Sequence, residues 1–131
     1  MDRGTSRIFA GCSKQSNVVD AKTGKVVAKI ANGDGTDALG YDASQKLIYI
    51  PGGRTGGMTV VHQDGPDKYT VVAIVPTMLG TKTLAVDAVS HKAYALALEY
   101  GPAPTPAAGT PAGRGGARGP LIGAWLFVIS H

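Results

Sequence analysis

Residues 42–51 read DASQKLIYIP, and this stretch decides the fold because two others align with it without gaps. Residues 2–11 read DRGTSRIFAG, and residues 87–96 read DAVSHKAYAL. Each copy begins with Asp, continues through a short polar stretch and places an aromatic residue seven positions after the Asp. We expect the three aspartates to form turns by accepting backbone N–H bonds, and the three aromatic residues, Phe9, Tyr49 and Tyr94, to lie in the core. The aspartates are separated by 40 and then by 45 residues. The chain is therefore an internal repeat, and a repeat of this length restricts the architecture more strongly than any single motif.

The second half of each copy repeats as well. Residues 17–30 read NVVDAKTGKVVAKI, and residues 59–75 read TVVHQDGPDKYTVVAIV. Both are β-branched runs around a turn rich in Gly, Asp or Pro, which is typical of a β-hairpin. Residues 127–130, FVIS, occupy the equivalent place in the third copy.

The pattern predicts an all-β chain, and no segment shows the helical period over ten or more residues. A period of about 40–45 residues with four strands per unit is typical of a β-propeller. We therefore expect a single partial β-propeller of about two and a half four-stranded antiparallel blades. The blade ranges are 1–36, 37–81 and 82–131, with a Gly- and Pro-rich loop insertion at 101–120. Strands are expected near 7–11, 17–20, 25–30, 37–41, 47–51, 58–62, 69–75, 83–87, 92–98 and 124–130.

In this alignment the first blade lacks its innermost strand and the last lacks its outermost strand. Propellers close as rings, so an incomplete set of blades exposes faces and strand edges. We expect these to be completed by upstream blades of a longer chain, with self-association as the alternative.

Composition sets the remaining limits. The formal net charge is +4 and charged residues make up 17% of the chain, which is ordinary for a folded domain. No apolar run approaches the roughly 18–20 residues of a membrane-spanning helix, and the first residues lack the apolar core of a signal peptide. The single cysteine, Cys12, has no His or acid at motif spacing and is expected to be a buried or half-buried structural thiol.

The motifs at 18–30, VVDAKTGKVVAKI, and at 33–42, GDGTDALGYD, resemble those of the bacterial YVTN-type (YncE-like) β-propeller repeat family. The resemblance extends over essentially the whole chain. The chain is similar to the C-terminal blades of such proteins. It implies a parent protein of the periplasm or the cell exterior. It implies little about chemistry, because the family includes relatives of dehydrogenase subunits, lyases and nucleic-acid-binding proteins.

Antiparallel alternation sorts the connections onto two ends of the blades. One end receives the longer connections, and loops on a rigid scaffold commonly carry binding sites. The candidate ligand-binding residues there, near the central channel, are Asp37, Arg54, Lys82 and Glu99. Arg54 lies between Gly52-Gly53 and Gly56-Gly57, which suggests that its backbone can approach a ligand.

The sequence contains no arrangement typical of a catalytic nucleophile or a metalloprotease. His62, Asp64 and Asp67 are better explained by local structure than as metal ligands, because His62 ends a strand and Asp64 and Asp67 belong to a turn. No metal, cofactor or catalytic residue is therefore predicted. We expect a non-catalytic binding or scaffold module with an unidentified ligand or protein partner at the channel face. The alternatives are the propeller portion of a dehydrogenase-associated or lyase-type enzyme, and nucleic-acid binding through the same face.

Overall fold

The computed structural model describes residues 1–105 and 118–130, and its described part is all β. The strands are grouped into three antiparallel sheets, each a meander of strands consecutive in the chain. The first sheet contains β1 (Arg7–Ala10), β2 (Gln15–Asp20) and β3 (Val26–Ala31). The second contains β4 (Gly40–Asp42), β5 (Leu47–Gly52), β6 (Gly57–Gly65) and β7 (Lys68–Pro76). The third contains β8 (Thr83–Asp87), β9 (Lys92–Tyr100) and β10 (Leu121–Ser130).

The expectation of an all-β chain is confirmed, and every expected strand overlaps an observed one. The strand expected at 37–41 was placed wrongly, because β4 begins only at Gly40. Its ladder with β5 starts at the Gly40–Tyr49 pair. Two residues before Gly40, the extended ladder would place Ala38 opposite Pro51, which has no backbone N–H to donate. The carbonyl of Pro51 instead accepts a hydrogen bond from the Thr36 hydroxyl at 2.8 Å.

The hairpin of β6 and β7 is longer than expected. The ladder continues to the Gly65–Lys68 pair, so that only Pro66 and Asp67 form the turn. Part of the expected loop insertion, 106–117 with Arg114, lies outside the described residues. Its ends meet, since the Gly101 N–H donates to the Pro120 carbonyl at 2.8 Å.

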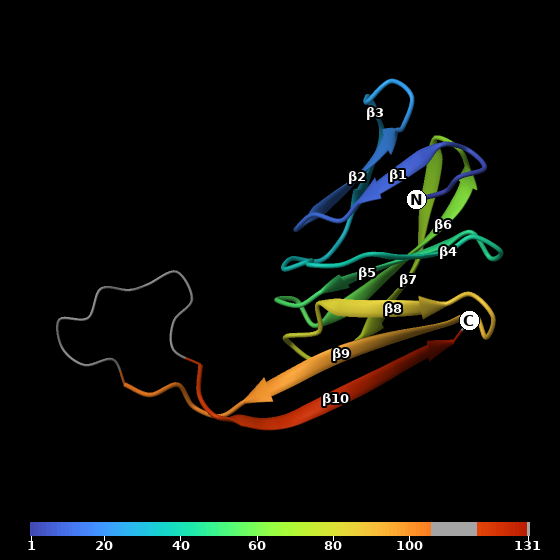
Figure 1. Ribbon diagram of the computed structural model, residues 1–131. Coiled ribbons are helices and arrows are strands. Elements are labelled where there is room, and N and C mark those ends of the chain that lie inside the picture. Colours follow the sequence, from blue (N-terminus) through green and yellow to red (C-terminus); the bar gives the residue numbers. More distant parts are fainter. Residues whose placement is uncertain (106–117, 131) are drawn as a thin grey trace.

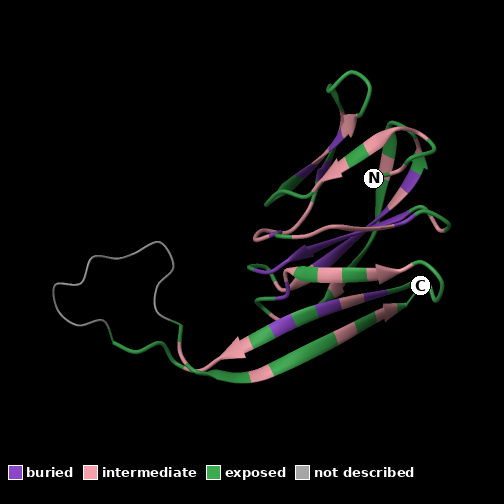
Figure 2. Ribbon diagram, viewed as in Figure 1, coloured by how far each residue is buried: buried purple, intermediate pink, exposed green. Residues whose placement is uncertain are grey.

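The three sheets stack face to face in chain order, with the second in the middle (Figure 1). Because side chains alternate between the faces of a strand, the middle sheet contributes to two apolar clusters. Leu47 and Tyr49 of β5 pack toward the third sheet. Ile48 and Ile50 pack toward the first. As a result β5 is buried along its whole length, whereas β10 is largely exposed (Figure 2).

The same cross-strand pair recurs in each sheet. An aromatic residue on one strand lies opposite a valine on the next, as Phe9–Val18, Tyr49–Val60 and Tyr94–Val128. The first two pairs lie in the clusters between sheets. The expectation that the three aromatic residues are core residues is therefore confirmed for Phe9 and Tyr49. It is wrong for Tyr94, which lies on the outer face of the third sheet because its neighbours Ala93 and Ala95 point inward.

The aspartates that begin each repeat form turns, as expected. The carboxylates of Asp2, Asp42 and Asp87 each accept a hydrogen bond from the backbone N–H two residues later. Two residues beyond that donor, the chain adopts a positive φ of 55–56° in each turn, at Ser6, Lys46 and His91.

The expectation that Cys12 is buried or half-buried is wrong. Cys12 is exposed, because it lies in the loop after β1 ends and not within the strand.

Candidate functional site

The connections between strands gather at two ends of the stack. Those between β3 and β4, between β5 and β6, and between β7 and β8 lie at the same end as the β9–β10 connection (left in Figure 1). Three of these connections are joined through their backbones. The Gly53 N–H donates to the Gly35 carbonyl at 3.2 Å, and the Gly80 N–H donates to the Gly53 carbonyl at 2.6 Å. A continuous hydrogen-bonded chain therefore links loops from the first, second and third sheets.

The centre of this chain leaves little room for a side chain. A Cβ atom on Gly53 would lie 3.0 Å from the Lys82 Cβ and 3.2 Å from the Gly35 carbonyl oxygen. The glycines around Arg54 thus serve the packing of the loops. The backbone N–H of Arg54 is used within the protein, because it donates to the Asp34 carbonyl at 3.0 Å.

A cavity of about 500 Å³ opens beside these loops. Its polar lining comes from Asp37 before β4, Arg54 between β5 and β6, and Lys82 before β8. The structure thus brings together three of the four residues selected from the sequence. A volume of this size lies within the range of small-molecule sites.

Glu99 is placed differently from the other three. Leu98 and Tyr100 line the cavity, and alternation along β9 puts Glu99 between them on the opposite face. Its carboxylate accepts a hydrogen bond from the Trp125 indole N–H at 2.9 Å. Glu99 therefore does not contribute to this cavity.

Two ion pairs hold the charged side chains at the cavity. The Lys82 ammonium lies 2.7 Å from the Asp37 carboxylate. Arg54 lies 3.7 Å from Asp34, while most of its side chain remains exposed. Desolvation would raise the pKa of Asp34, but the Gly35 N–H and the charge of Arg54 outweigh it and lower that pKa.

Sequence reasoning missed the apolar wall and one cation of the cavity. Leu96, Leu98 and Tyr100 form the wall, and the Arg118 guanidinium lies 5.2 Å from the centre of the Tyr100 ring. The signal was present in residues 94–100, YALALEY, where large side chains alternate with small ones. Arg118 carried no local signal, because it lies at the end of the Gly- and Pro-rich segment.

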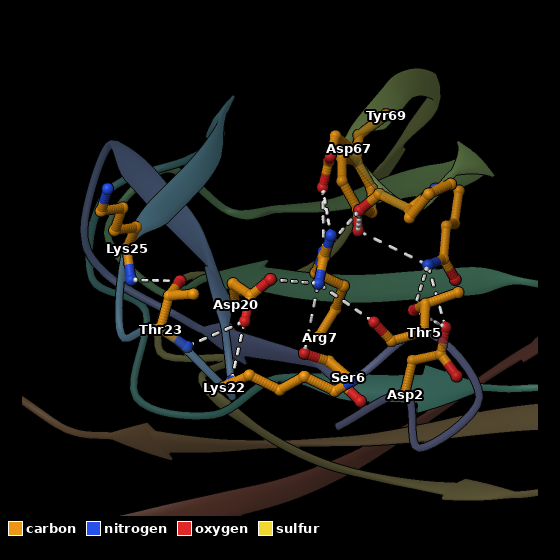
Figure 3. A network of polar contacts seen from close by, with 12 residues as sticks. Asp2, Thr5, Ser6, Arg7, Asp20, Lys22, Thr23, Lys25, Asp67 and Tyr69 are labelled. Carbon is orange, nitrogen blue, oxygen red and sulfur yellow. Dashed lines mark hydrogen bonds and ion pairs between the residues drawn. The ribbon is translucent and has the colours of Figure 1, made fainter.

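A second polar cluster lies around Arg7, at the turns of the first and second sheets (Figure 3). Its guanidinium contacts Asp20 at 2.9 Å and Asp67 at 2.8 Å, and the side chain is 11% exposed. Asp67 thus forms an ion pair with Arg7, whereas His62 Nδ1 lies 2.8 Å from Asp64 Oδ1. Within residues 1–105 and 118–130, no three His, Cys, Asp or Glu side chains gather as a metal site would require.

The described residues contain no helix long and apolar enough to cross a membrane. Comparison with family models and with curated proteins found no match to the sequence.

Proposed function

We propose that this chain is a non-catalytic binding module built on part of a β-propeller of the YVTN-type, YncE-like class, acting in the periplasm or outside the cell. The observation that carries the proposal is the cavity at which Asp37, Arg54 and Lys82 converge from three separate connections. The propeller interpretation is supported by meander sheets stacked in chain order, with the same cross-strand pair at the same register.

The charges of the cavity favour an anionic ligand. Three cations, Arg54, Lys82 and Arg118, face a single lining carboxylate, Asp37. That carboxylate is paired with Lys82, and Arg54 lies 3.7 Å from Asp34, so Arg118 provides the excess positive charge of the cavity. Guanidinium groups bind carboxylates and phosphates through paired hydrogen bonds.

The opposite wall of the cavity favours an apolar or aromatic portion in the same ligand. Leu96 and Leu98 present aliphatic surface, and the Tyr100 ring lies beside Arg118. Apolar walls with a few convergent polar groups are typical of small-molecule sites. The ligand class that fits is therefore a small organic anion with an aromatic or aliphatic body.

Titration calorimetry with 2-naphthoate tests the proposal, with the neutral 2-naphthalenemethanol as the matched probe. We expect the carboxylate to bind at least about tenfold more tightly than the alcohol, because charge-assisted hydrogen bonds are roughly twice as strong as neutral ones. Arg54→Ala and Arg118→Ala should each weaken binding of the carboxylate. Arg3→Ala, which removes an exposed arginine outside the cavity lining, should not.

Equal binding of the two probes would contradict the proposal, as would affinities unchanged in both cavity variants. A single-stranded oligonucleotide provides a further comparison. Tight, salt-dependent binding of the oligonucleotide that is lost in Arg54→Ala would favour a nucleic-acid ligand over a small anion.

A further inference from the structure

The connections that lead into β4 and β8 contain the same three-residue motif. Residues 35–37 read GTD and residues 80–82 read GTK, and each motif ends five positions before the Asp of its repeat. The glycine that begins each motif adopts a positive φ, of 80° in the first and 86° in the second. Asp37 and Lys82 therefore occupy the same position in successive copies of the repeat, and they carry opposite charges.

Buried threonines at the centre of the two motifs, Thr36 and Thr81, anchor both connections. The Thr36 hydroxyl donates to the Pro51 carbonyl at 2.8 Å. On the other connection, the Gly80 N–H donates to the Gly53 carbonyl at 2.6 Å. The charged side chains that follow the threonines are about half exposed, at 52% in the first motif and 42% in the second. The backbone thus fixes where the two charges lie, while the charges themselves remain accessible to a ligand.

The two charges form an ion pair at the cavity described above. Lys82 Nζ lies 2.7 Å from Asp37 Oδ2, and both residues line the cavity. The pair therefore presents a positive and a negative group side by side. A ligand with a carboxylate alone would be attracted by Lys82 and repelled by Asp37, and a ligand with an ammonium alone would meet the reverse combination.

We propose that the ligand of this cavity is a free α-amino acid with an aromatic or aliphatic side chain. The inference rests on the binding function proposed above and narrows its ligand class. An α-amino acid carries its ammonium and its carboxylate on one carbon atom, so its two charges are about as far apart as those of the Lys82–Asp37 pair. Its carboxylate would lie beside Lys82 and its ammonium beside Asp37, so that each charge of the ligand meets an opposite one.

The rest of the cavity fits the remainder of such a ligand. Arg118 adds a second cation for the carboxylate, and Leu98 and Tyr100 offer apolar surface for the side chain. A peptide fits less well, because its terminal ammonium and its terminal carboxylate lie on different residues. The pairing of the two charges therefore favours the free amino acid.

Titration calorimetry with three compounds that share a phenyl group tests the inference. L-Phenylalanine carries both charges, 3-phenylpropanoate lacks the ammonium and 2-phenylethylamine lacks the carboxylate. We expect L-phenylalanine to bind at least about tenfold more tightly than either of the others, because each missing charge removes a charge-assisted hydrogen bond.

The Asp37→Asn variant isolates the contribution of the ammonium. It should weaken binding of L-phenylalanine at least about tenfold, because the ammonium loses its charged acceptor. Binding of 3-phenylpropanoate should stay the same or become tighter, because the variant lacks the charge that repels the carboxylate. Asp64→Asn is the matched control outside the cavity lining and should change neither affinity. Circular dichroism of each variant checks that the sheets are folded.

L-Phenylalanine that binds no more tightly than 3-phenylpropanoate would overturn the inference, as would an affinity for L-phenylalanine that Asp37→Asn leaves unchanged. If 2-naphthoate nevertheless binds more tightly than 2-naphthalenemethanol, the proposed binding of a small organic anion stands without the amino acid. If neither 2-naphthoate nor L-phenylalanine binds, both proposals are wrong.

Discussion

His91 Nδ1 lies 2.8 Å from Asp42 Oδ2, so the turn that precedes β9 is joined to the turn that precedes β5. The Asp42 carboxylate is fully buried and also accepts hydrogen bonds from the Ser44 hydroxyl and from the backbone N–H groups of Ser44 and Gln45. Desolvation alone would raise the pKa of Asp42. The hydrogen bonds, first from Ser44 and then from His91, outweigh it and lower the pKa from 3.8 to about 2.

This carboxylate should make stability depend on pH. Because its pKa is lower in the folded chain, its contribution is present above the unfolded value of 3.8 and is lost as pH falls toward 2. We expect Asp42→Asn to lower the free energy of unfolding at pH 7 by about 2 kcal/mol. The difference from the unmodified chain should shrink between about pH 4 and pH 2. Urea denaturation across this range measures both effects. Asp37→Asn, at a half-exposed ion pair, is the control and should change stability little. A stability difference for Asp42→Asn that stays constant with pH would contradict the lowered pKa of Asp42.

Gly40 sets how closely the second and third sheets approach. A Cβ atom there would lie 2.4 Å from Val86 Cγ2 and 2.7 Å from Leu84 Cδ1, both on β8. We expect Gly40→Ala to lower the free energy of unfolding by about 1–3 kcal/mol, since overpacking forces neighbouring strands apart. Gly65→Ala is the matched control, because nothing lies within 4 Å of its added Cβ. Thermal melting of the two variants tests this prediction. Equal melting temperatures would show that the second and third sheets can move apart at Gly40 without loss of stability.

The buried Tyr49 and the half-buried Tyr41 should respond oppositely to removal of their hydroxyl groups. The Tyr49 hydroxyl has no hydrogen-bond partner within the described part of the chain, whereas the Tyr41 hydroxyl donates to Gln63 Oε1 at 2.5 Å. An unpaired buried hydroxyl is costly, so Tyr49→Phe should leave stability unchanged or raise it by about 1 kcal/mol. Tyr41→Phe should lower stability by about 1 kcal/mol, because it leaves the amide oxygen of Gln63 without the hydroxyl that donates to it. Denaturant titration measures both, and a Tyr49→Phe chain less stable than Tyr41→Phe would refute the comparison.

Arg7 contacts Asp20 at the end of β2 in its own sheet and Asp67 in the β6–β7 turn of the second sheet, so it joins the first sheet to the second. We expect Arg7→Met to lower the melting temperature and Arg7→Lys to recover only part of the loss, because an ammonium cannot reproduce the forked contacts of a guanidinium. Arg3→Met removes an exposed arginine close in the chain and should melt as the unmodified protein does. If Arg7→Met and Arg3→Met melt at the same temperature, Arg7 does not hold the two sheets together.

The repeat made much of this fold predictable from sequence. Alternation and turn residues located the strands, and the repeated Asp predicted turns that the structure confirms at Asp2, Asp42 and Asp87. The late start of β4 was not predicted, because it depends on Pro51 in a neighbouring strand. Where a strand begins because of a residue in its partner strand, the sequence of the strand itself does not predict that start.

The candidate site was predictable only in part, for a similar reason. Asp37, Arg54 and Lys82 were selected because they lie in connections that topology brings to one end of the sheets. Glu99 was selected from its position in a loop, but β9 continues to Tyr100 and turns Glu99 to the other face. Tyr100 and Arg118 meet across the ends of a long insertion, and such long-range contacts leave no local pattern.

The meander connectivity also determines the order in which the sheets can form during translation. Among the described residues, every hydrogen-bonded pair of neighbouring strands is consecutive in the chain. The first sheet can thus be paired as soon as Ala31 has emerged, without waiting for any later segment. Its apolar face then stays uncovered only until the hairpin of the next sheet arrives. Synthesis from the N-terminus can therefore lay down the stack one sheet at a time, which shortens the exposure of each apolar face during translation.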